Sequence, residues 1–61
     1  MITENDVLGW LESLARSQGF YGRILEAFRE ADEEVVTAFI DTLNENGVRD
    51  IVDFTIFIEE N

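Results

Sequence analysis

The sequence predicts an all-α fold, a compact bundle of three to four short helices that forms one domain over residues 1–61. Apolar residues recur at spacings of three and four along most of the chain, as in amphipathic helices. Short polar stretches, at Gln18–Gly19 and at residues 44–47, separate these periodic segments where turns are expected. A length of 61 residues allows one domain at most.

The first helix is predicted to begin after Thr3, because Asp6 stands three residues later and completes a variant of the capping box. It is expected to end at Gln18, with Gly19 in the left-handed conformation that often follows a helix. Its apolar stripe consists of Val7, Leu8, Trp10, Leu11, Leu14 and Ala15.

The second helix is predicted over residues 20–31 from four apolar residues at helical spacing, Tyr21, Ile24, Leu25 and Phe28. Asp32 has the residue type of an N-cap for the third helix, and the acids that follow it suit a positive helix end. The third helix is expected to end at residues 44–47 and to bury Val35, Val36, Phe39, Ile40 and Leu43.

The last segment, residues 49–60, fits a helix better than a strand. Asp50 and Asp53 suit a helix start, but the segment is rich in β-branched residues. A strand remains the alternative, although it would have no pairing partner in this chain except across a dimer. A helix that is apolar nearly all round, as this one would be, is expected to be mostly buried and central.

Pairs of opposite charge at helical spacing support the first two helices. Glu12 with Arg16 is an i, i+4 pair, while Glu26 stands three residues from both Arg23 and Arg29. Each pair would stabilise its helix by only about 0.2–0.5 kcal/mol.

The composition argues against catalysis. The chain has no His and no Cys, so no Ser-His or Cys-His nucleophile can be assembled. Residues 42–47 with Asp53 overlay a calcium-binding loop around Gly47, but Thr42, Arg49 and Asp53 depart from the expected residue types. A helix end and turn is the preferred interpretation. We therefore expect no enzyme activity, no cofactor and no metal.

The net negative charge of the chain limits the classes of partner that it is expected to bind. Fourteen acids against four arginines leave a net charge of -10, which disfavours direct contact with nucleic acid or an anionic membrane. No apolar stretch approaches the roughly 18 residues of a membrane span. The absence of cysteine and the polar, acidic start of the sequence favour a cytoplasmic location. A protein partner, either basic or neutral, is the remaining expectation.

Two sets of residues are candidates for contact with a partner. Aromatic and arginine side chains are enriched at interface hot spots, which selects Trp10, Phe20, Tyr21 and Arg23. The favoured alternative places the aromatics in the core, with Gly22 allowing close helix approach. The second set is a possible acidic face made of Glu26, Glu30, Glu33, Glu34, Asp41 and Glu45. A solvated face is the favoured reading, and mimicry of a nucleic-acid backbone is the alternative.

The stretches Ser17–Leu25 and Val52–Glu59 resemble small acidic proteins encoded by phages and mobile elements of gut and other Gram-positive bacteria. The resemblance implies a biological setting but no mechanism and no catalytic residue. The leading functional hypothesis is thus a small accessory protein that binds another protein. The alternatives are an acidic inhibitor that mimics nucleic acid to block a basic protein, and a self-associating module such as a homodimer.

Overall fold

The computed structural model describes residues 1–60 and confirms the all-α prediction. Within that range the chain forms four helices and no strand. They are α1 (Glu4–Ala15), α2 (Gly19–Glu30), α3 (Glu33–Glu45) and α4 (Ile51–Glu60). The last segment is therefore a helix, as preferred from the sequence, and the strand alternative is wrong.

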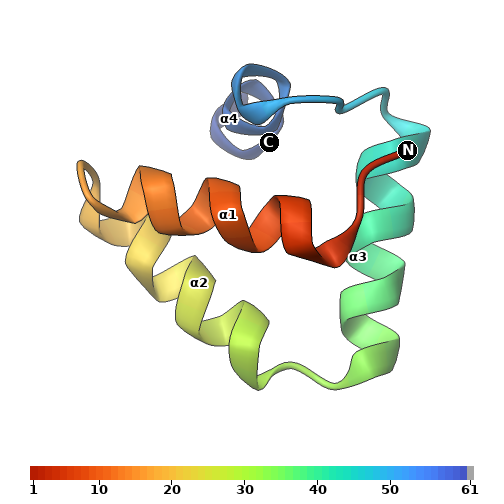
Figure 1. Cartoon of the computed structure of the whole chain (residues 1–61), viewed down its shortest axis with the longest axis horizontal. Coiled ribbons are helices and arrows are strands. Elements are labelled where there is room, and N and C mark those ends of the chain that lie inside the picture. The colour runs from red at the N-terminus through yellow and green to blue at the C-terminus, as the bar shows by residue number, and fades with distance from the viewer. Residues whose placement is uncertain (61) are drawn as a thin grey trace.

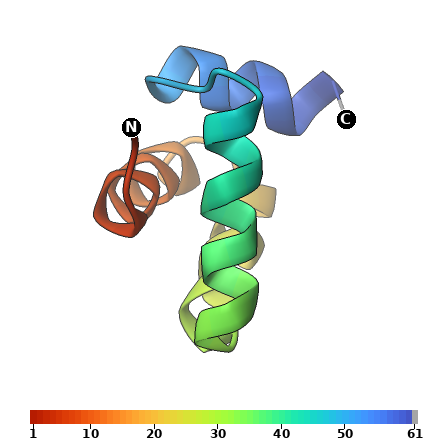
Figure 2. The same ribbon diagram turned by 90° about the vertical axis from the view of Figure 1, so that its right-hand side faces the viewer.

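Helices α1, α2 and α3 form the sides of a triangle, and α4 lies above the side made by α1 (Figure 1). Figure 1 shows α2 and α3 diverging from their connection, with α1 closing the open side and α4 seen end-on above it. Turned by 90°, the molecule shows α4 crossing the C-terminal end of α3 (Figure 2). The N-terminus lies beside that same end of α3.

All four helices contribute to one hydrophobic core, whose fully buried side chains are Val7, Leu11, Tyr21, Leu43 and Phe54. Aromatic rings connect the helices. The Phe39 ring centre lies 6.0 Å from that of Phe28 and 6.5 Å from that of Phe54. The Trp10 ring centre lies 5.5 Å from that of Phe54. Burying each such side chain stabilises the fold by about 1.5–3 kcal/mol, so Phe54 is the chief attachment of α4.

At the starts of α1 and α4, aspartate side chains accept hydrogen bonds from backbone amides. The Thr3 amide donates to the Asp6 carboxylate at 2.8 Å, which confirms the predicted capping box of α1. At α4 the Asp53 amide donates to the Asp50 carboxylate at 2.8 Å, while the Arg49 amide donates to the Asp53 carboxylate at 3.2 Å. These bonds satisfy amides that a helix start leaves without partners.

The predicted end of the first helix is wrong. Helix α1 ends at Ala15, and the amides of Ser17 and Gln18 both donate to the Leu14 carbonyl. These bonds finish the helix without a left-handed residue, and Gly19 instead opens α2. Among residues 1–60 only Gly47 has a positive φ, 74°, at the turn predicted after the third helix.

The N-cap predicted for the third helix is confirmed in its position, although its side chain does not act as a cap. Asp32 does precede α3, but its carboxylate makes no capping hydrogen bond. The amides of Val35 and Val36 donate to the Asp32 backbone carbonyl instead. Residue type therefore located the helix start without describing how that start is stabilised.

Two expectations about burial are also wrong. Helix α4 is not central, since Phe54 is its one fully buried side chain, while Val52 and Ile56 are 62% and 50% exposed. Val35 of α3, expected in the core, is 58% exposed. Helix α4 docks by one face, and no other helix among residues 1–60 covers its Val52 and Ile56.

The predicted ion pairs within helices do not form. Arg29 of α2 instead reaches across to Glu12 of α1, with 2.8 Å between its Nη2 and the carboxylate Oε2. It is the one salt bridge among residues 1–60, and both side chains are about half exposed. Such exposed pairs typically stabilise a fold by less than about 1 kcal/mol.

Candidate functional site

Tyr21 is a core residue, so its candidacy for partner contact is corrected. Its side chain is fully buried, and its hydroxyl donates a 2.9 Å hydrogen bond to the Glu59 carboxylate in the last turn of α4. Burial raises the pKa of the Tyr21 phenol above 10.0, and the bond to the Glu59 carboxylate raises it further. The bond ties α2 to the end of the chain.

The other three candidates from the aromatic set do not form one patch with it. Trp10 is half-buried and packs on Phe54, so it joins α1 to α4. Phe20 stacks on Tyr21, with 4.2 Å between ring centres, and remains 36% exposed. Arg23 is exposed one turn further along α2. Phe20 and Arg23 are therefore the members of this set that α2 offers to a partner.

An apolar concave surface lies between α2 and α3. This α2–α3 groove has a volume of about 200 Å³ and is lined by Ile24, Ala27, Phe28, Ala31, Val35, Val36 and Phe39. None of these side chains carries a polar or charged group. The sequence did not predict this groove, because its pattern indicates a buried Val35 and gives no role to Ala27.

The groove exists because small residues face the larger ones across it. Ala27 on α2 and Ala31 directly after its end fill little space, while Val35 stands exposed at the start of α3. Phe20 is four residues before Ile24 and so continues the same stripe of α2 by one turn. The signal in the sequence was therefore a pair of alanines at helical spacing opposite a valine.

The six acids proposed as a face are all exposed, and part of the set is brought together. Glu33, Glu34 and Asp41 line one shallow hollow on the outer side of α3, together with Thr37 and Ala38. Glu34 directly precedes Val35 in the sequence, whereas Asp41 lies on the face of α3 away from the groove-lining Val36 and Phe39.

The remaining acids lie at other places on the two helices. On α2, Glu30 is one turn beyond Ala27, at the outer edge of the same groove, and Glu26 precedes it by a turn. Glu45 is the last residue of α3.

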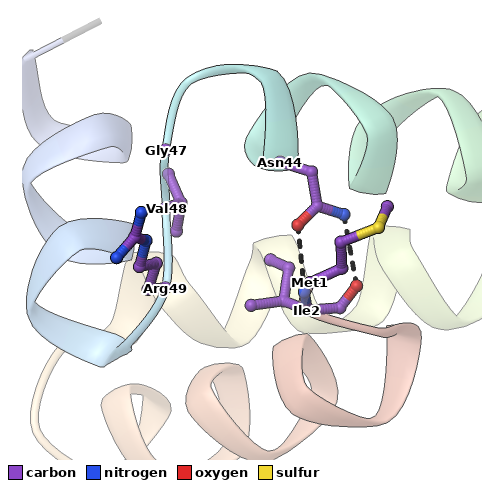
Figure 3. Close-up of a pocket in the computed structure, with 6 residues that line it drawn as sticks. All are labelled: Met1, Ile2, Asn44, Gly47, Val48 and Arg49. Carbon is purple, nitrogen blue, oxygen red and sulfur yellow. Dashed lines mark hydrogen bonds between the residues drawn. The ribbon is translucent and has the colours of Figure 1, made fainter.

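A second hollow, of about 530 Å³, lies where the N-terminus meets the end of α3, and is lined by Met1, Ile2, Asn44, Gly47, Val48 and Arg49. Figure 3 shows the Asn44 side chain turned toward Ile2, whose amide donates to Asn44 Oδ1 at 2.9 Å and whose carbonyl accepts from Nδ2 at 3.2 Å. Arg49 supplies the one ionisable side chain of this lining. The hollow thus holds no pair of groups for acid–base chemistry.

The calcium-loop overlay is wrong. Thr42 lies inside α3, where its hydroxyl donates to the Ala38 carbonyl, and Asp53 lies inside α4, where it accepts the Arg49 amide. In the part of the chain that the structure describes, no three carboxylates are grouped so that they would hold a metal ion.

Neither the helices nor the comparisons point to a known class of protein. No helix among residues 1–60 has the length and apolar character needed to cross a membrane. Comparisons with protein-family models, curated proteins and solved structures find no match to this chain. The function must therefore be argued from the apolar groove between α2 and α3 and from the exposed acids of these helices.

Proposed function

We propose that this chain is a small non-catalytic module that binds another protein through the α2–α3 groove. The observation that carries the proposal is an open, wholly apolar concave surface on a molecule whose other features are strongly acidic. Exposed apolar surfaces that are bordered by polar residues are typical of interaction sites. The resemblance to proteins of mobile elements is consistent with an accessory role in the cytoplasm.

The chemistry of the groove favours a protein side chain over a metabolite. Small-molecule sites commonly enclose about 300–1,000 Å³ and place a few polar groups to orient the ligand. The groove is smaller, at about 200 Å³, and its lining has no charged or polar side chain. One bulky apolar side chain from a partner would fill it and would remove Val35 from water.

The two alternative functions receive less support. Mimicry of nucleic acid uses charge alone, whereas this chain also exposes an apolar groove between α2 and α3. Self-association would bring together two chains of net charge -10, and their mutual repulsion opposes a dimer at low salt. Binding to a different protein meets neither objection.

The experiment is affinity capture from a lysate of the native host with three tagged proteins, the wild type, Val35→Asn and Val52→Asn. The two substitutions are matched, because both valines are about 60% exposed and only Val35 lines the groove. We expect a specific protein to be retained in moderate salt by the wild type and by Val52→Asn but not by Val35→Asn. Equal capture by all three would contradict the groove, and loss of every partner in moderate salt would favour mimicry.

A further inference from the structure

The occupant of the α2–α3 groove can be specified further, on the premise of the proposed function. We infer that it is a short basic amphipathic helix, which inserts one bulky apolar side chain and carries Lys or Arg on its flanks. Three features of the groove lead to this inference, namely its walls, its volume and the charges at its borders.

The walls exclude an added strand. Both sides of the groove are helices, whose interior backbone amides and carbonyls already bond within the helix. An extended peptide gains affinity by pairing with exposed backbone groups, and these walls offer none between their ends. An amphipathic helix satisfies its own backbone and needs only apolar side chains to contact the groove. The geometry therefore favours a helix.

The borders of the groove carry more negative than positive charge. On α2 the exposed Glu30 is one turn beyond Ala27, and on α3 the exposed Glu34 directly precedes Val35. Neither of these carboxylates makes an ion pair within residues 1–60. Arg23, on the outer side of α2, opposes them with a single positive charge. A flanking Lys or Arg would thus find unpaired carboxylates on both sides.

The same charges argue against a second copy of this chain as the occupant. The other exposed apolar stripe is Val52 with Ile56 on α4, one helical turn apart. That helix brings its own acids, Asp53, Glu59 and Glu60, toward any surface it approaches. Placing it between Glu30 and Glu34 would set like charges side by side, which costs free energy.

The test uses a panel of synthetic helical peptides that share one apolar face, with Leu, Phe or Trp at the central position. Each peptide is made with Lys on its flanks and again with Glu. Binding is measured by fluorescence anisotropy at low and moderate salt against the full chain. We expect at least one Lys-flanked peptide to bind, more weakly as salt rises, and its Glu-flanked match not to bind.

Variants of the protein identify the surface. Val35→Asn is expected to weaken binding by about tenfold, as loss of a valine contact predicts, and Val52→Asn to leave it unchanged. The pair Glu30→Gln and Glu34→Gln should weaken binding by about fivefold at low salt. Arg23→Gln should strengthen it, so the two changes of charge have opposite expected signs.

Four results would overturn the inference, and they separate it from the proposed function. Equal binding of Lys- and Glu-flanked peptides would remove the basic partner. If no peptide binds but the wild type captures a protein from lysate and Val35→Asn does not, the groove remains a protein-binding site and the basic helix is excluded as its occupant. Peptide binding that is insensitive to Val35→Asn would contradict both proposals. Sedimentation of the chain alone at twice its monomer mass would assign the groove to a second copy.

Discussion

At the scale of single residues, the Tyr21 hydroxyl is the polar group on which the packing of α4 most depends. It lies at the end of a fully buried ring and bonds to a carboxylate 38 residues away in the sequence. Hydrogen bonds to charged groups contribute about 1.5–3 kcal/mol when buried, and less when one partner is exposed, as Glu59 is. This hydrogen bond joins α2 to the last turn of α4.

Tyr21→Phe tests that contact, because it removes the hydroxyl and keeps the ring in the core. We expect the free energy of unfolding to fall by about 1 kcal/mol, measured by urea denaturation. Glu59→Gln keeps a hydrogen-bond acceptor and should cost less. Unchanged stability of Tyr21→Phe would show that water replaces the bond without loss.

The raised pKa of Tyr21 makes stability depend on alkaline pH. The neutral phenol is favoured in the folded chain, so its contribution is complete below pH 10.0 and is lost as the pH rises through the folded pKa. Because Tyr21 is the one tyrosine of the sequence, phenolate absorbance follows it directly. We expect its titration midpoint above 10.0 in the folded protein and a shift toward 10.0 in urea. Coincident midpoints would contradict the burial argument.

At the scale of helices, three glycines give predictions of opposite sign. A Cβ at Gly9 would meet no atom within 4 Å, and one at Gly22 would lie 4.0 Å from the Ala15 Cβ, an ordinary contact. Gly9→Ala and Gly22→Ala are each expected to raise stability by about 0.5–1 kcal/mol, since glycine weakens a helix interior. Gly47→Ala should lower it by about 1–2 kcal/mol, because Gly47 holds a φ of 74°.

Thermal melts followed by circular dichroism would measure all three variants. A loss of stability in Gly22→Ala would show that the two helices need the close approach that the sequence suggested. A neutral Gly47→Ala would show that the turn after α3 relaxes without cost.

Asp50 is the corresponding test for the start of α4. Replacing it with alanine removes the acceptor of the Asp53 amide and is expected to cost about 1 kcal/mol. Asp41→Ala is the control, because Asp41 is an exposed acid in the interior of α3. Equal urea midpoints for the two variants would contradict a capping role for Asp50.

The sequence predicted helices well and their surroundings poorly, for physical reasons. The spacing of apolar residues and the pairs Thr3–Asp6 and Asp50–Asp53 depend on local geometry, so the helix starts were accessible. The exposure of Val35 and Val52 depends on which helix lies opposite, which no local pattern contains. The groove was missed on the same ground, because Ala27 becomes part of a concave surface only once α3 is placed against α2.

At the scale of the whole molecule, charge is the dominant property. Fourteen acids share one salt bridge among the described residues, and no charged side chain there is buried. These carboxylates are therefore exposed to solvent, and dissolved salt screens the repulsion between them. At 0.1 M salt the screening length is about 10 Å. The fold carries this repulsion as a cost to its stability at low ionic strength.

We accordingly expect the melting temperature to rise as NaCl increases from low to moderate concentration. Glu45→Gln should be more stable than the wild type at low salt by about 0.3–1 kcal/mol, because Glu45 ends α3 where the helix dipole opposes a negative charge. The variant should also respond less to salt. A melting temperature that stays constant across this range would show that the charges are dispersed well enough not to repel.

Because Trp10 contacts Phe54, the intrinsic fluorescence of Trp10 can report whether α4 is docked. Trp10 is the sole tryptophan in the sequence, and its ring lies against the residue that anchors α4. Its emission should shift to the red when α4 detaches, whereas circular dichroism reports all four helices at once. Unfolding curves from the two signals that fail to superimpose would reveal a state in which the triangle of α1, α2 and α3 survives alone.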